Sequence, residues 1–65
     1  MNVLICYYNV DNLNHTQKDT ELEIMRNNLE DMVKGEDDVR VLVVPVRNQE
    51  TKIENIFVSS IDKLI

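Results

Sequence analysis

The chain has 65 residues, of which 43% are apolar and 29% are charged, and its formal net charge is −5. This length allows one domain, residues 1–65, which buries only about 60% of the surface of its unfolded chain. A single Cys and a single His exclude an intramolecular disulfide and a structural zinc site as sources of stability. We therefore expect self-association to stabilise the fold. We also expect a non-enzymatic protein, because so few residues leave little support for a catalytic site.

The N-terminal segment predicts a strand that is buried on both sides. Residues 3–10 read VLICYYNV, which is apolar on both alternating faces and rich in strand-forming residues. No basic residue precedes Lys18, and the apolar run is too short for a signal peptide or a membrane span. We expect a cytoplasmic protein without membrane contact, located in the host cytoplasm if the chain is viral.

The next segment predicts an amphipathic helix, because apolar residues recur there at helical spacing: Leu22, Met25, Leu29, Met32 and Val33. Two pairs are candidates for its N-terminal cap, Thr16 with Asp19 and Thr20 with Glu23. Gly35 is placed to end the helix.

A second strand is predicted over Val39–Val46, which reads VRVLVVPV. Strands joined by a helix of this length run parallel, with a right-handed crossover. Pro45 lacks a backbone N–H, so the edge of the second strand is expected to be exposed or bent at that point.

The C-terminal segment has two interpretations. A second helix is favoured because Thr51 and Glu54 match a capping box and the apolar residues follow helical spacing: Ile53, Ile56, Phe57, Ile61, Leu64 and Ile65. The alternative is a third strand over residues 53–59, because Ile, Phe and Val favour strands.

These elements predict a compact βαβα unit of the α/β class with a small parallel sheet. Two short helices cover one face of such a sheet well and the other only in part, whereas parallel sheets are normally covered on both faces. We therefore expect a second copy of the chain to complete the core, in a homodimer or a larger oligomer. Packing between sheet faces and pairing between strand edges are both open.

The charge distribution excludes general nucleic-acid binding. Glu36, Asp37 and Asp38 crowd the turn at the amino end of the sheet, and the chain has no basic stripe to neutralise phosphates.

The opposite end of the sheet predicts a binding site, because ligands of open parallel sheets bind beyond the carboxyl ends of the strands. Helix N-termini there favour an anion such as a phosphate, including a nucleotide, and a tyrosine, Tyr7 or Tyr8, is available to stack on a base. The candidate ligand-binding residues are Tyr7, Asn9, Asp11, Asn12, His15, Arg47, Asn48, Thr51 and Lys52. The structural alternative is that the Asn and Thr residues are only caps and turn formers.

Other chemistry finds little support in the sequence. One Gly cannot build a glycine-rich phosphate loop. Cys6 lies within an apolar strand, where a core cysteine is expected rather than a nucleophile. His15, Asp19 and Asp11 make an incomplete ligand set for a metal ion. We predict no catalytic residue, no cofactor and no metal.

Residues 44–54, which read VPVRNQETKIE, resemble a stretch found in small phage-encoded proteins of unassigned function. The resemblance implies a viral accessory protein. The resulting hypothesis is a homo-oligomer that inhibits or sequesters a host component, either a host protein or a nucleotide-type signal, as in counter-defence. Two alternatives are a virion or assembly component and a small phosphate-binding module at the carboxyl edge of the sheet.

Overall fold

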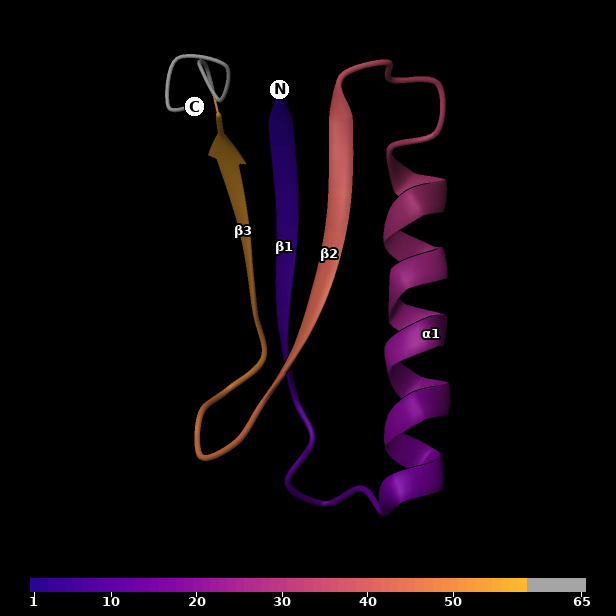
Figure 1. Cartoon of the computed structure of the whole chain (residues 1–65), viewed down its shortest axis with the longest axis vertical. Helices are drawn as coiled ribbons and strands as arrows, with labels where there is room; N and C mark the ends of the chain where they lie inside the picture. The colour runs from indigo at the N-terminus through magenta and orange to yellow at the C-terminus, as the bar shows by residue number, and fades with distance from the viewer. Residues whose placement is uncertain (59–65) are drawn as a thin grey trace, which may run out of the picture.

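The computed structural model describes residues 1–58, which form one helix and a three-stranded sheet (Figure 1). The elements in chain order are β1 (Asn2–Asn9), α1 (His15–Met32), β2 (Val39–Val46) and β3 (Lys52–Phe57). The strand order is β2-β1-β3, with β1 parallel to β2 and antiparallel to β3. The predicted α/β class and the predicted parallel pair are confirmed, but the sheet is mixed rather than all-parallel.

The segment after β2 corrects the favoured interpretation of the C-terminal region. A helix over residues 53–57 is wrong, because Lys52–Phe57 forms a strand, and the alternative of a third strand is confirmed there. A strand cannot make its backbone hydrogen bonds within its own segment, and β1 provides the partners that β3 needs. The pairing continues to Val58, whose N–H donates to the Met1 carbonyl at 2.8 Å. The part of the predicted helix over 59–65 lies outside the described residues.

Helix α1 begins earlier than either predicted cap. Asn14 is the N-cap residue: its side chain accepts from the Gln17 N–H at 2.8 Å, and the Gln17 side chain accepts from the Asn14 N–H at 3.0 Å. Thr16 and Thr20 therefore lie inside the helix, and both predicted caps are wrong. Gly35 lies in the turn that follows the helix, with a φ of 95°, which confirms it as part of the helix stop.

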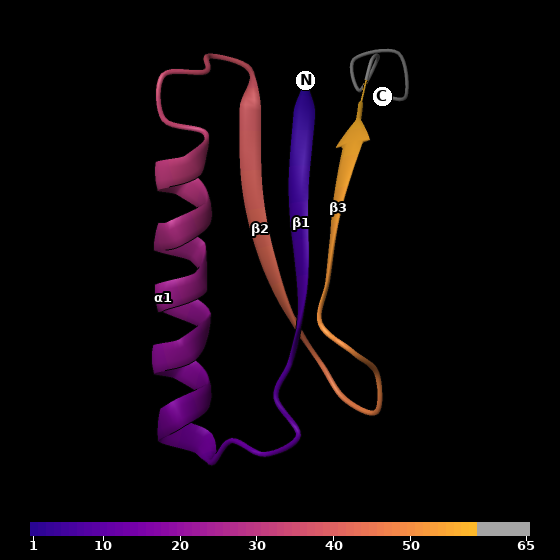
Figure 2. The same ribbon diagram turned by 180° about the vertical axis from the view of Figure 1, so that it is seen from behind.

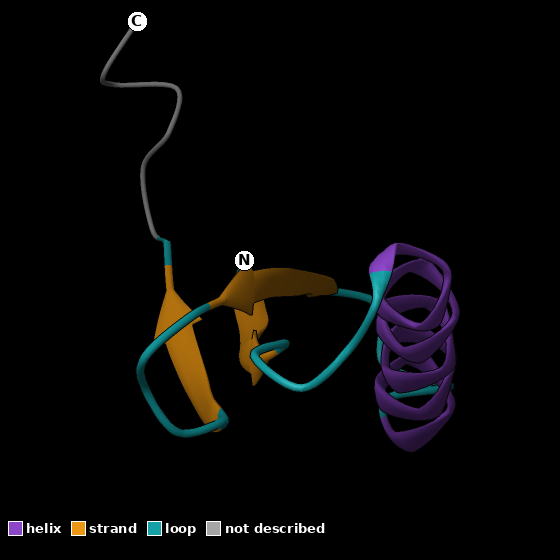
Figure 3. Cartoon of the chain, turned by 90° about the horizontal axis from the view of Figure 1, so that it is seen from below, coloured by secondary structure: helices purple, strands orange, loops and turns teal. Residues whose placement is uncertain are grey.

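The helix covers one face of the sheet and leaves part of that face open. Tyr8 marks the covered face, because its hydroxyl donates to the Glu21 carboxylate of α1 at 3.2 Å. Figures 1 and 2 show α1 beside β2, on the side away from β3, and Figure 3 shows the same arrangement end-on. The best-buried side chains are those of Cys6, Val10 and Leu29. The core therefore lies under α1, between β1 and β2.

Candidate binding surfaces

Four of the predicted ligand-binding residues form one hydrogen-bonded cluster, the polar loop cluster, at the carboxyl ends of β1 and β2: Asn9, Asp11, Asn48 and Thr51. The Asn9 side chain donates to Asp11 at 3.0 Å, and the Asn9 N–H donates to the Thr51 hydroxyl at 3.0 Å. The Asn48 N–H donates to both carboxylate oxygens of Asp11, at 3.2 and 3.1 Å. This cluster ties the loop after β1 to the loop after β2.

Asp11 is the charged centre of the polar loop cluster. Hydrogen bonds from the Asn9 side chain and from the Asn48 N–H, helped by the charge of Arg47, lower the pKa of its carboxyl below the usual value. Asn48 adopts a φ of 61°, which Asn tolerates better than most residues and which turns its N–H toward Asp11. The Asp11 carboxylate accepts from the Asn48 N–H, which is a donor that an anionic ligand would need. These hydrogen bonds therefore fit a structural role, in which the cluster joins two loops. Anion binding here stays a prediction.

Tyr7 and Lys52 line a shallow hollow of about 210 Å³, together with Gln49, Glu50 and Glu54. The hollow adjoins the polar loop cluster, because the Asn9 side chain donates to the Gln49 carbonyl at 2.6 Å. The Lys52 ammonium lies 2.6 Å from the Glu54 carboxylate, and this hydrogen bond raises the pKa of Lys52. Lys52 is thereby committed to a partner within the chain. The hollow has more acidic than basic groups, which disfavours a phosphate.

The remaining predicted site residues are exposed. Asn12 lies in the turn after β1, His15 is the first residue of α1, and Arg47 follows β2. The structure thus brings four of the predicted residues together in the polar loop cluster and two in the hollow. Asn12, His15 and Arg47 line neither that hollow nor the larger one between α1 and β2.

Cys6 is fully buried in the central strand, as predicted for a core cysteine. Burial raises the pKa of its thiol, which disfavours the thiolate that a nucleophile would need. Within residues 1–58, no group of three or more His, Cys, Asp or Glu side chains is arranged to hold a metal ion. In the same part of the chain, no helix combines the length and apolar character needed to cross a membrane.

The outer edge of β3 is a surface that the candidate site residues did not include. Met1 and Val58 exchange two backbone hydrogen bonds, of 3.0 and 2.8 Å, which sets the phase of the antiparallel ladder. Because hydrogen-bonded and non-hydrogen-bonded pairs alternate in such a ladder, the backbone groups of Ile53, Asn55 and Phe57 face away from β1. No strand among residues 1–58 pairs with this edge.

The side chains of β3 are also exposed, on both faces of the sheet. Ile53 and Phe57 lie on the face that α1 covers over β2, yet they are 51% and 63% exposed because the helix does not extend over β3. Ile56, on the opposite face, is 40% exposed. The strand-forming residues of this segment predict a strand, but they do not predict that the strand lies at the edge of the sheet.

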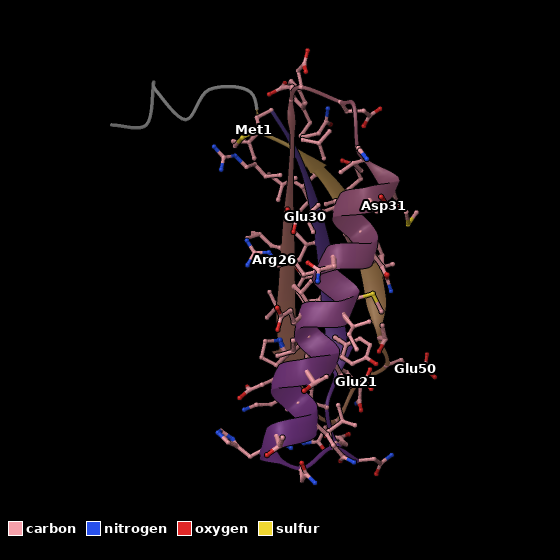
Figure 4. The ribbon with its side chains drawn as sticks, turned by 90° about the vertical axis from the view of Figure 1, so that its right-hand side faces the viewer. Met1, Glu21, Arg26, Glu30, Asp31 and Glu50 are labelled. Atoms are coloured by element: carbon pink, nitrogen blue, oxygen red, sulfur yellow. The ribbon has the colours of Figure 1, made fainter. Side chains whose placement is uncertain are left out.

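The outer edge of β2 differs from that of β3. The Asn2 N–H donates to the Asp38 carbonyl and the Val10 N–H donates to the Val46 carbonyl, so alternate residues of β2 bond to β1. In this phase the nitrogen of Pro45 faces outward, which confirms the expected exposed edge at that point and costs the sheet no hydrogen bond. A hollow of about 530 Å³ separates this edge from α1. Figure 4 shows Arg26 and Glu30 on one side of the helix and Glu21 on the other.

The fold and these surfaces are the basis for a functional proposal, because known proteins offer no match to this chain. No protein-family model, no curated protein and no solved structure matches this chain. The resemblance of residues 44–54 to phage-encoded proteins therefore stays a prediction.

Proposed function

We propose that this chain is a non-catalytic binding module, acting as a homo-oligomer, that captures an extended segment of a partner protein along the outer edge of β3. Capture of this kind inhibits or sequesters the partner. The observation that carries the proposal is the outward-facing backbone of Ile53, Asn55 and Phe57 on a strand whose apolar side chains are exposed.

Strand addition explains how such an edge binds. The N–H and C=O groups of an added peptide pair with the outward backbone groups of the edge strand, and alternate side chains of the peptide contact the exposed apolar residues. On the helix side those contacts are Ile53 and Phe57. The backbone gives affinity, while the apolar contacts select peptides with alternating apolar residues.

The edge of β2 is a poorer acceptor of an added strand. Pro45 offers no N–H to an incoming peptide, and proline at an edge is a common protection against such pairing. Within Lys52–Phe57, the strand β3 contains no proline.

Charge favours a basic partner. The net charge of the chain is −5, and complementary charge speeds the encounter between two surfaces. The partner segment is therefore an extended peptide with alternating apolar residues and flanking Lys or Arg. We infer a host protein as its source, because the resemblance of residues 44–54 implies a viral accessory protein.

The test is selection of peptides from a random decapeptide display library, followed by binding measurements with two variants at one position. Asn55→Pro removes an outward N–H without removing a bond to β1, whereas Asn55→Ala keeps that N–H. We expect Asn55→Pro to weaken the binding of selected peptides by roughly tenfold or more, and Asn55→Ala to leave it nearly unchanged.

Folding controls decide how these results are interpreted. Far-ultraviolet circular dichroism and thermal melting must show that both variants keep the wild-type fold. Equal peptide binding by folded Asn55→Pro and Asn55→Ala would overturn strand addition at β3. Failure of the library to yield any peptide with alternating apolar residues would do the same.

A further inference from the structure

The hollow between α1 and the outer edge of β2, here called the α1–β2 groove, has a volume of about 530 Å³. Val41 and Val43 line it on the sheet side. Alternate residues of β2 bond to β1, in the phase set by the hydrogen bond from the Asn2 N–H to the Asp38 carbonyl, so the backbone groups of Val41 and Val43 face outward. No strand among residues 1–58 pairs with them. The groove therefore offers backbone groups with which an extended peptide can pair.

The helix side of the α1–β2 groove is acidic. It is lined by four exposed charged residues: Asp19, Glu23, Arg26 and Glu30. The Arg26 Nε lies 3.4 Å from a Glu30 carboxylate oxygen, so these two charges neutralise each other. Asp19 and Glu23 make no ion pair with another described residue, and Arg26 is the only basic residue among the described ones that line the groove. The remaining negative charge favours a cationic occupant.

The spacing of the Asp19 and Glu23 carboxylates matches the repeat of an extended chain. Asp19 and Glu23 are four residues apart on α1, so they lie on one side of the helix, about 6 Å apart along its axis. In a strand, side chains on one face recur at every second residue, at intervals of about 6.6 Å. Helix α1 runs alongside β2 (Figures 1 and 2). A strand added at the edge of β2 therefore presents every second side chain at nearly the interval of the two carboxylates.

We propose that the α1–β2 groove binds an extended segment of a partner protein that carries Lys or Arg at alternate positions. The backbone of the segment pairs with Val41 and Val43. Its basic side chains point toward Asp19 and Glu23. This site goes beyond the proposed function at the edge of β3, which selects alternating apolar side chains. Pro45 shortens the backbone ladder at the edge of β2, so the ion pairs with α1 supply the selectivity here.

The test compares two labelled peptides that are as long as the eight residues of β2. The alternating peptide repeats Lys-Thr, and the regrouped peptide repeats Lys-Lys-Thr-Thr, so both have the same composition and charge. Only the alternating peptide places Lys at every second position, on one face of a strand. We expect it to bind roughly fivefold or more tightly at low salt, as measured by fluorescence anisotropy. The difference should shrink as salt is added, because exposed ion pairs are screened.

Two double variants separate the groove from the general charge of the protein. Asp19→Asn with Glu23→Gln removes the two carboxylate charges in the groove. Asp31→Asn with Glu36→Gln makes the same change in net charge at exposed residues that do not line the groove. Figure 4 shows Asp31 on the side of α1 away from Arg26. We expect the first double variant to bind the alternating peptide roughly fivefold or more weakly, and the second to bind it within roughly twofold of the wild type. Circular dichroism establishes that both are folded.

Backbone N-methylation of the alternating peptide tests pairing with β2. The backbone groups of alternate residues in a strand face the same side, so only one set of residues in the peptide, Lys or Thr, donates to β2. Methylation of that set removes the donors, whereas methylation of the other set leaves them in place. We expect one methylated peptide to bind roughly tenfold or more weakly and the other to bind nearly as tightly as the unmethylated peptide.

Four outcomes would overturn the proposal. They are no measurable binding of the alternating peptide, equal binding of the alternating and regrouped peptides, equal losses in the two double variants, and equal effects of the two methylation patterns. We expect Asn55→Pro, the variant that tests the edge of β3, to bind the alternating peptide like the wild type. Failure of the groove and failure of the proposed function at β3 are therefore distinguishable.

Discussion

The two strands that flank β1 face different surroundings. β2 runs parallel to β1, lies beside α1, and carries Pro45 at its outer edge. β3 runs antiparallel to β1, and no described helix covers it. Both strands pair with the backbone of β1, but the β2 side chains on the helix side are half-buried, whereas Ile53 and Phe57 of β3 are mostly exposed. The comparison teaches that hydrogen-bond pairing and burial are separate requirements, and that the β3 flank meets only the first.

The largest expected effect comes from truncating one apolar side chain on each flank. Leu29→Ala removes a side chain that is only 2% exposed, and we expect a loss of about 2–5 kcal/mol in the free energy of unfolding. Phe57→Ala removes one that is 63% exposed, and we expect a change within about 0.5 kcal/mol. Urea denaturation at dilute concentration measures both. Similar losses of unfolding free energy for the two variants would show that the side chains of the two flanks contribute equally to stability.

A smaller effect is expected from the cap of α1. Asn14→Ala removes the side-chain acceptor of the Gln17 N–H, and we expect a loss of about 1 kcal/mol in the free energy of unfolding. The control is Asn12→Ala, an exposed residue of the same loop that caps no helix. Thermal or urea unfolding of the two variants measures the difference. An equal loss for Asn12→Ala would show that the loop, and not the cap, stabilises the α1 flank.

The smallest expected effect is the pH dependence of the polar loop cluster, which joins the two flanks. Because the pKa of Asp11 is lower in the folded state, the ionised carboxylate favours the folded loop. This contribution is present above the ordinary carboxyl value of 3.8 and is lost as pH falls through the lower folded value. We expect the NMR amide signal of Asn48 to titrate with a midpoint below 3.8 in the wild type. In Asp11→Asn this transition should be absent, and its persistence there would assign it to another carboxyl.

Sequence patterns predicted β1, α1 and β2 because the apolar residues of each segment fit one kind of element. Leu22 and Leu29 repeat at helical spacing, whereas the segments around Cys6 and Val43 are apolar on both faces. For residues 53–57, helical spacing and strand propensity conflicted, and pairing with β1 decided for the strand. The cap at Asn14 was missed because two Thr residues nearby offered similar patterns, and only the chain path after Val10 selects among them.

The candidate site was predicted in part for a similar reason. The loops that follow β1 and β2 do meet, through Asp11 and Asn48, because parallel strands end at the same edge of a sheet. Their hydrogen bonds are made to one another, which the identities of the residues do not reveal. The outward backbone of Asn55 was missed because the direction of a backbone group depends on ladder phase, and ladder phase is fixed by a contact between Met1 and Val58, far apart in the chain.

The sequence by itself predicted a helix between two parallel strands, because the apolar residues of each segment follow the spacing of one element, and the structure confirms this arrangement. Tertiary structure alone decided that Lys52–Phe57 is a strand, that it lies on the far side of β1 from β2, and that no other strand among residues 1–58 pairs with its outer edge. The physical reason is that local periodicity reports which side chains share a face. Which face is covered, and which edge is paired, depends on contacts between distant segments.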